Sequence, residues 1–225
     1  MTNTRSVFRF ALGLAVLLSF VAVTHAGFGS IITVRDFPEF AVAGKPLNLT
    51  FKVWVPSKEP LRQLRAWVTA TSKKGTVAKV YAKPGPGPEE FTVALTLPEP
   101  GDWSVEIDDN SKLPPLKVIA PGAVAPPPFP LTDRGRQLFV VKGCNACHLR
   151  NGPTDGYTYG PDLTGKRFPP DYLRRFLTDP SITPVPDEVC NRAGTICGSP
   201  YAMPSLDLKK PEIEALVVFI NSSGK

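Results

Sequence analysis

The chain has 225 residues, enough for one large or two small domains at roughly 150 residues per domain. Hydrophobic residues make up 42% and charged residues 20%, which excludes a wholly disordered chain. The 26 prolines are more than twice the usual share of ~5% and exclude long uninterrupted helical bundles, because proline breaks helix interiors. The net charge of +6 is modest and evenly spread, so we expect no nucleic-acid partner.

Residues 1–26 have the pattern of a secretory signal peptide. Arg5 and Arg9 precede an uncharged run over residues 10–23, and Thr24-His25-Ala26 places small residues around a cleavage point after Ala26. If this segment were not cleaved it would act as an N-terminal membrane anchor, although the run is shorter than the ~20 residues of a spanning helix. We therefore expect a periplasmic or secreted protein in a compartment that permits disulfides.

Residues 27–120 predict an all-β domain, because apolar and polar residues alternate with period two between Gly- and Pro-containing turns. About seven strands in roughly 90 residues are typical of a small β-sandwich. The strands are expected at 30–35, 47–55, 64–70, 76–82, 91–97, 103–107 and 115–119. The strand pattern with Gly101-Asp102-Trp103 resembles immunoglobulin-like modules of exported bacterial proteins, which implies binding or docking; a rigid spacer is the alternative. The block holds no His, Cys or Met, which excludes a blue-copper site.

Residues 121–130 are rich in proline and predict a semi-rigid linker between two domains, with a proline-recognition peptide as the alternative. After this segment the apolar period becomes helical, which predicts a small all-α domain over residues 131–225. The first helix is expected over 133–146 with Thr132 as its cap. A second is expected to begin at Pro170 and end at Asp179-Pro180, and a third to begin at Pro211.

The sequence Cys144-Asn145-Ala146-Cys147-His148 is a C-x-x-C-H motif. Two thiols at this spacing can form thioethers with the two vinyl groups of one haem, and the adjacent His can then ligate its iron. A redox-active pair would need a βαβ context, which the flanking helix and loop do not provide. A zinc site would need a second pair, which Cys190 and Cys197 could supply, but it would leave His148 without a role.

Residues 131–225 resemble a class I c-type cytochrome. The resemblance rests on Gly135 and Phe139, the C-x-x-C-H motif, Gly160-Pro161-Asp162-Leu163, and Met203-Pro204 ahead of a helix with Phe219. It implies a few helices around one covalent haem c, with the first and last helices crossing where Gly135 permits close approach. It also implies that the carbonyl of Pro161 accepts a hydrogen bond from the proximal imidazole of His148.

Met203 is the expected sixth ligand. It is the only thioether of the mature chain, no second His remains after cleavage, and it lies where the family places its distal Met. His/Met ligation leaves the iron six-coordinate, which suits electron transfer better than substrate binding. The alternative is a surface or gap-filling methionine.

Cys190 and Cys197 lie in a Pro- and Gly-rich insertion over residues 181–202 that departs from a minimal cytochrome. Seven residues of separation in an oxidising compartment predict a disulfide that stiffens the segment before Met203. A redox-active or metal-binding pair is the alternative.

The function expected from these residues is that of an exported electron-transfer protein with one haem c. Its cofactor-binding residues would be Cys144, Cys147, His148, Pro161 and Met203, with His148 and Met203 on the iron. Redox proteins would donate and accept the electron, within or beside a larger complex such as a membrane oxidase or dehydrogenase. A haem enzyme acting on peroxide or a small oxyanion, and a haem-based sensor, are the alternatives; no distal His is present to assist peroxide chemistry.

Overall fold

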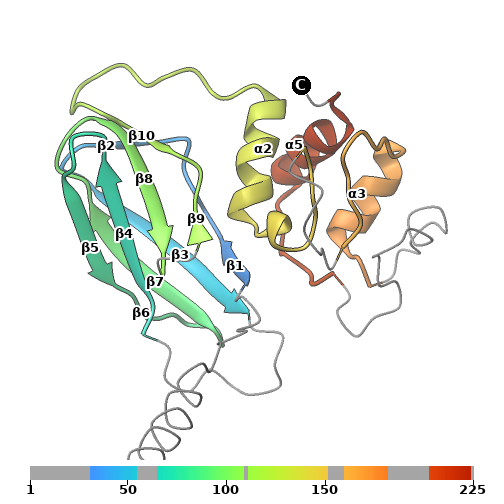
Figure 1. Ribbon diagram of the computed structural model, residues 1–225, viewed down its shortest axis with the longest axis horizontal. Helices are drawn as coiled ribbons and strands as arrows, with labels where there is room; N and C mark the ends of the chain where they lie inside the picture. The colour runs from blue at the N-terminus through green and yellow to red at the C-terminus, as the bar shows by residue number, and fades with distance from the viewer. Residues whose placement is uncertain (1–30, 55–64, 109–110, 152–159, 182–202, 224–225) are drawn as a thin grey trace, which may run out of the picture.

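The computed structural model describes residues 31–54, 65–108, 111–151, 160–181 and 203–223, and it shows a β-rich part beside a helical part (Figure 1). The predicted signal peptide, Cys190 and Cys197 lie outside these residues. No helix within the described ranges combines the length and the apolar character needed to cross a membrane.

The β-rich part is a pair of sheets. One sheet has the order β1-β3-β7-β6, and the other has the order β2-β10-β8-β4-β5, with β9 paired to β8. All pairs are antiparallel except β10 with β2. The strands are β1 (Ile31–Val34), β2 (Phe40–Val42), β3 (Pro46–Trp54), β4 (Trp67–Ser72), β5 (Val77–Tyr81), β6 (Lys83–Pro84), β7 (Glu90–Thr96), β8 (Gly101–Ile107), β9 (Ser111–Lys112) and β10 (Leu116–Ile119).

The alternating residues of the long strands form a core between the two sheets. Leu49, Phe51 and Val53 of β3 are buried, as are Trp103, Val105 and Ile107 of β8. The Phe51 and Phe91 rings stack at 5.7 Å where β3 and β7 pair directly. The predicted sandwich is therefore present, because period-two sequences bury one face of each strand.

The strand number differs from the prediction. The described residues contain ten strands where about seven were expected, and the additional ones, β2, β6 and β9, have only two or three residues each. Segments this short cannot display an alternating pattern. They pair because a longer neighbour offers its edge, as β7 does when Phe91 pairs with Pro84.

The helical part contains α2 (Leu131–Val141), a short 3-10 helix η1 (Cys144–Ala146), α3 (Pro170–Thr178) and α5 (Lys210–Asn221). Helix α5 lies between α2 and α3 (Figure 1). Residues 121–130, the predicted linker, form neither helix nor strand and run from β10 to α2. The molecule thus has mixed secondary structure, a two-sheet sandwich with three α-helices in the described residues.

The predicted helix ends need correction. Helix α2 begins at Leu131 with Pro130 at the N-cap, so Thr132 is inside its first turn and caps nothing. It ends at Val141 rather than at 146, because Gly143 adopts a left-handed conformation with φ of 72°. Helix α3 begins at Pro170 and stops before Asp179, as predicted. Helix α5 begins at Lys210, one residue before the predicted Pro211.

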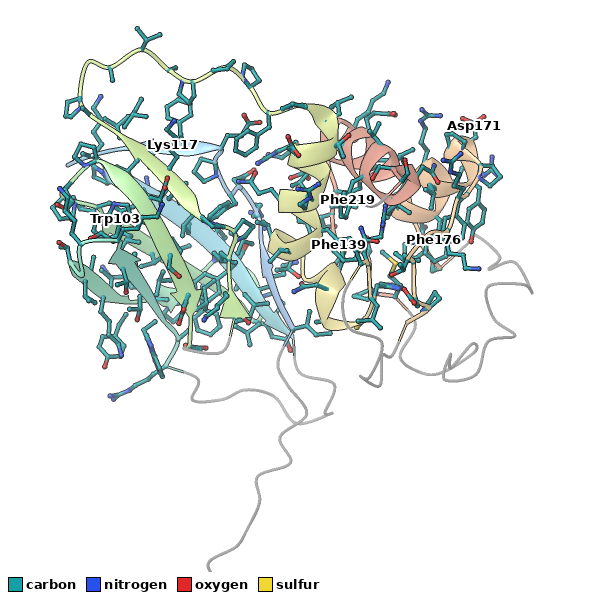
Figure 2. The ribbon with its side chains drawn as sticks, turned by 45° about the horizontal axis from the view of Figure 1, so that its top comes forward. Trp103, Lys117, Phe139, Asp171, Phe176 and Phe219 are labelled. Carbon is teal, nitrogen blue, oxygen red and sulfur yellow. The ribbon has the colours of Figure 1, made fainter. Side chains whose placement is uncertain are left out.

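Helices α2 and α5 cross at Gly135. A Cβ atom there would lie 2.1 Å from the carbonyl oxygen of Ala215 and 2.5 Å from Cβ of Phe219, so only glycine fits. The rings of Phe139 and Phe219 meet beside the crossing with centroids 5.5 Å apart, as Figure 2 shows between the two helices. The close approach expected at Gly135 is therefore present, and the contact between Phe139 and Phe219 lies beside it.

The helical part also packs on the sandwich. Val141, the last residue of α2, is fully buried and belongs to the apolar core formed by the strands. Arg134 of the same helix donates a hydrogen bond of 3.1 Å to the carbonyl oxygen of Phe37, in the segment between β1 and β2. Helix α2 therefore packs against α5 and also contacts the β-rich part through Arg134 and Val141.

Candidate functional site

The C-x-x-C-H motif lies on one tight turn that follows α2. The amide of Cys147 donates to the carbonyl of Cys144 at 3.1 Å, and the amide of His148 donates to the same oxygen at 2.8 Å. The left-handed Gly143 turns the chain away from α2 just before this point. Local backbone hydrogen bonds therefore bring the three chemically active residues of the motif together in one turn.

Both cysteines of the motif are free thiols in surroundings that disfavour the thiolate. Cys144 is buried in the apolar cluster of the helical part, and burial raises its pKa to about 12. Burial also raises the pKa of the half-buried Cys147. Thioredoxin-like cysteines have lowered pKa values, because their thiolate is the nucleophile. The environment of this pair therefore counts against the redox-active alternative.

The ring of His148 has a defined orientation. Its Nδ1 lies 3.0 Å from the carbonyl oxygen of Pro161, the contact that the cytochrome resemblance implies. A carbonyl can only accept, so Nδ1 must carry the proton and the lone pair of the neutral ring is at Nε2. Burial lowers the pKa of His148, with the Pro161 hydrogen bond acting in the opposite direction. A neutral imidazole with Nε2 available is the form that binds a metal.

The segment after residue 160 lies along the motif. The amide of Gly160 donates to the carbonyl of Cys147 at 2.8 Å, and the amide of Leu163 donates to that of Leu149 at 2.9 Å. A Cβ atom at Gly160 would lie 2.4 Å from Cε1 and 2.6 Å from Nδ1 of His148. Glycine is thus required at position 160 for the chain to pass against the imidazole.

Met203 is half-buried and packs against the same apolar cluster that contains Cys144. Leu206 and Leu208, in the stretch between Met203 and α5, pack against this cluster as well. The described contacts therefore join Cys144, Cys147, His148 and Pro161 directly and bring Met203 to the same core. The predicted disulfide of Cys190 and Cys197 cannot be placed, since both residues lie outside the described ranges.

The donor set fits a covalent haem. Two adjacent free thiols, a neutral imidazole with Nε2 available and a thioether on the shared core are the groups that haem c requires from a protein. In the parts of the chain that the structure describes, no three His, Cys, Asp or Glu side chains gather as a metal site. The zinc alternative would need Cys190 and Cys197 from outside those parts.

Sequence reasoning missed three residues beside this site. Gly160 was noticed only as part of a family pattern, and its contact with His148 needed the fold. Lys142 and Glu212 form a buried ion pair of 2.9 Å directly before the motif. The available signal for the burial of Lys142 was its position between the apolar run Leu138–Val141 and Gly143. In the sequence, Glu212 is only an acidic residue directly after Pro211, the predicted start of the last helix, and nothing there indicates a buried partner.

The chain matches no known protein family and no curated protein. Among solved structures it is similar to the filamin domain of Lin-41, at 10% identity and a TM-score of 0.33, over 39% of this chain and 91% of that one. It is similar to a mutant of Salmonella alpha-2-macroglobulin at 16% identity and a TM-score of 0.34, over 48% of this chain and 7% of that one.

A variant of superoxide reductase (neelaredoxin) from Ignicoccus hospitalis matches at 17% identity and a TM-score of 0.25, over 40% of this chain and 82% of that one. These scores are too low to support an argument about fold or function. The two-sheet sandwich therefore rests on the strand pairing described above, and its immunoglobulin-like character stays a prediction.

Proposed function

We propose that this chain is an exported electron-transfer protein that carries one covalent haem c in a cytochrome c-type domain. Cys144 and Cys147 would provide the thioether links, and His148 and Met203 the two axial ligands. The observation that best supports the proposal is the hydrogen bond of 3.0 Å from His148 Nδ1 to the Pro161 carbonyl, which leaves Nε2 for iron. The signal-peptide pattern of residues 1–26 supports export.

A bound haem c supplies an iron that takes up and releases one electron. The residues of this chain would tune and protect that chemistry. His148 is held in one tautomer by Pro161, and the apolar cluster around Cys144 and Met203 would limit the access of water to a bound haem. If His148 and Met203 both bound the iron, they would leave no position for a substrate, which favours electron transfer over catalysis. The sandwich would dock the haem domain to a larger redox complex.

The test is the visible and near-infrared spectrum of protein matured with haem-attachment machinery. We expect haem that stays with the polypeptide under denaturing conditions, and a low-spin ferric form with the near-infrared band of Met–iron ligation. Met203→Ala should abolish that band and produce a high-spin form. Leu206→Ala, which removes a half-buried side chain from the same segment and the same cluster, is the matched control and should retain the band.

Wild-type protein without covalent haem would refute the proposal. A covalent haem whose near-infrared band persists in Met203→Ala would refute the assignment of the sixth ligand and leave the haem attachment intact.

A further inference from the structure

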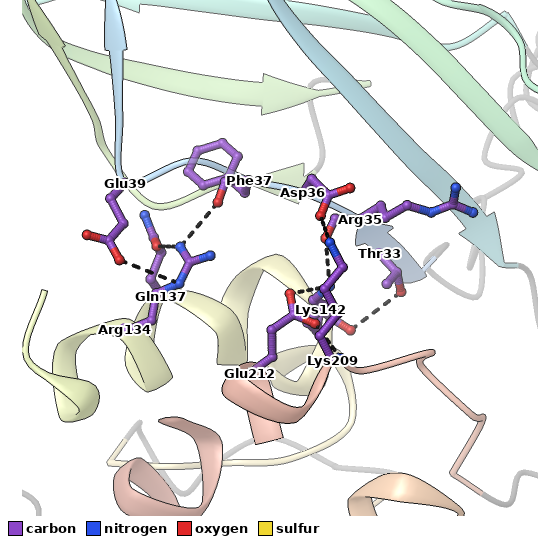
Figure 3. Close-up of polar contacts among 10 residues, drawn as sticks. All are labelled: Thr33, Arg35, Asp36, Phe37, Glu39, Arg134, Gln137, Lys142, Lys209 and Glu212. Carbon is purple, nitrogen blue, oxygen red and sulfur yellow. Dashed lines mark hydrogen bonds and ion pairs between the residues drawn. The ribbon is translucent and has the colours of Figure 1, made fainter. Parts of the chain in front are cut away.

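Lys142 is a buried lysine that the proposed function does not use. Its side chain is 2% exposed, and its ammonium lies 2.9 Å from Oε1 of Glu212 and donates to the carbonyl oxygen of Arg35 at 2.7 Å. Lysine is almost never buried without partners, because the charge must leave water. Here one partner belongs to α5 and the other to the segment that follows β1 (Figure 3).

Glu212 also accepts a hydrogen bond from the beginning of α5. Its second carboxylate oxygen, Oε2, accepts a hydrogen bond of 2.9 Å from the amide of Lys209, at the N-cap of the helix. Lys209 follows Met203 by six residues, and Lys142 precedes Cys144 by two. The single carboxylate of Glu212 thus connects the segment before the C-x-x-C-H motif to the segment after Met203.

The sandwich contributes backbone to the same arrangement. The hydroxyl of Thr33 in β1 donates to the carbonyl of Lys142 at 3.4 Å. A Cβ atom at Gly143 would lie 2.9 Å from both Cγ2 of Ile31 and the carbonyl oxygen of Ile32, so β1 lies directly against the turn that leads to Cys144. The start of the haem-attachment motif is therefore fixed on one side by α5 and on the other by β1 and the residue after it.

We infer that the Lys142–Glu212 ion pair is a positioning element for the haem ligands, and that the sandwich is part of the support of the haem site. The pair holds the segments that lead to His148 and from Met203 in one arrangement, with the Arg35 carbonyl as a third anchor. This inference rests on the proposed function. It predicts that loss of the pair weakens the Met203–iron bond in a protein that remains folded and keeps its covalent haem.

The test variant is Lys142→Met/Glu212→Gln. Removing one partner alone would leave an unpaired buried charge, which is strongly destabilising, whereas the double change removes both charges. Methionine retains the length of the lysine stem, and the amide oxygen of Gln can still accept from the Lys209 amide. The readouts are the Met–iron near-infrared band and the rate at which cyanide binds the ferric protein by displacing Met203. We expect that rate to rise about tenfold, as is typical when a group that orients a metal ligand is lost.

Two controls separate positioning from general weakening. Lys52→Met/Asp207→Asn removes an ion pair of 3.5 Å between β3 of the sandwich and the stretch before α5, but its side chains are 46% and 78% exposed. Val105→Ala lowers stability from within the sandwich core, at a buried residue of β8 that is neither a member of the ion pair nor one of its hydrogen-bond partners. Both should bind cyanide within about twofold of the wild-type rate, since neither touches Lys142 or Glu212.

Cyanide binding at the wild-type rate in the folded double variant would overturn the inference. If that variant does not fold, the test uses Lys142→Gln/Glu212→Gln, because two amides can replace the ion pair by a hydrogen bond. We expect its cyanide-binding rate to rise about threefold, and an unchanged rate would overturn the inference. Failure of the proposed function is distinguishable, since it would appear in the wild-type spectrum as missing covalent haem.

Discussion

His148 is oriented by two features of a segment that follows it in the chain. The carbonyl of Pro161 accepts from its Nδ1, and Gly160 leaves room for the ring, because a Cβ there would lie within 2.9 Å of both ring nitrogens and Cε1. The hydrogen bond to Pro161 fixes the tautomer of His148, and the lack of a side chain at Gly160 lets the backbone approach the imidazole ring closely. Orientation of a ligand by its neighbours in this way contributes strongly to metal affinity.

Gly160→Ala should therefore displace the imidazole of His148 and break its hydrogen bond to Pro161. In wild-type protein without haem, nitrogen NMR shifts of the ring should show one tautomer, protonated at Nδ1. The variant should show a mixture of tautomers. In the haem-loaded variant, we expect the binding of His148 to the iron to weaken about tenfold.

Asn145→Ala is the control, because Asn145 is exposed in the same turn and should leave the single tautomer unchanged. Gly160→Ala protein with the wild-type tautomer would show that the ring does not depend on the glycine.

At the level of the elements, the crossing of α2 and α5 organises the helical part. The contact at Gly135 is with backbone, the Ala215 carbonyl, and backbone cannot move aside as a flexible side chain can. Phe139 and Phe219 pack beside it, and Arg174 joins α3 to α5 through Glu214 at 2.9 Å. The position of the C-x-x-C-H turn, which begins three residues after the end of α2, depends on this crossing.

Gly135→Ala should lower the free energy of unfolding by about 2 kcal/mol in urea denaturation. A Cβ atom 2.1 Å from a backbone oxygen places the overpacking cost near ~3 kcal/mol, the upper end of its usual range, and the gain in helix propensity offsets about 1 kcal/mol of it. Arg136→Ala, at the exposed neighbouring position, should change it by no more than ~0.5 kcal/mol. A more stable Gly135→Ala protein would mean that the two helices do not approach at this residue.

At the level of the whole molecule, the sandwich and the helices share buried contacts. Val141 of α2 lies in the apolar core of the strands, the Arg134 side chain bonds to the Phe37 carbonyl, and Lys142 bonds to that of Arg35. Contacts of this kind couple the stability of the two parts. We therefore expect them to unfold together.

Two spectroscopic probes of unfolding should accordingly give the same denaturation midpoint for the wild-type protein. All three tryptophans lie in β-strands, so their fluorescence reports the sandwich, and helical ellipticity reports the helices. Val141→Ala should lower the common stability by about 2 kcal/mol through the cavity it leaves. Val124→Ala, at a position 93% exposed between β10 and α2, is the matched control and should have an effect within ~0.5 kcal/mol. Two separate midpoints in the wild type would contradict the coupling.

The local features of this protein could be predicted from its sequence. The long strands follow from period-two alternation, and the start of α3 and its end at Asp179 follow from proline chemistry. The gathering of Cys144, Cys147 and His148 follows from their spacing, since residues this close must share a turn. The His148–Pro161 contact was predicted through a family resemblance, which supplied information on a contact between residues 13 apart in sequence.

Only the tertiary structure decided which distant residues meet. An apolar residue such as Val141 requires cover, but its pattern does not say whether a helix or a sheet provides it, and here the sandwich does. In the sequence, Lys142 and Glu212 each resemble ordinary charges at a helix end. Only the packing of α2 against α5 brings them together as a buried ion pair. Burial and partner choice depend on the packing of whole elements, so periodicity and spacing, which are local, cannot specify them.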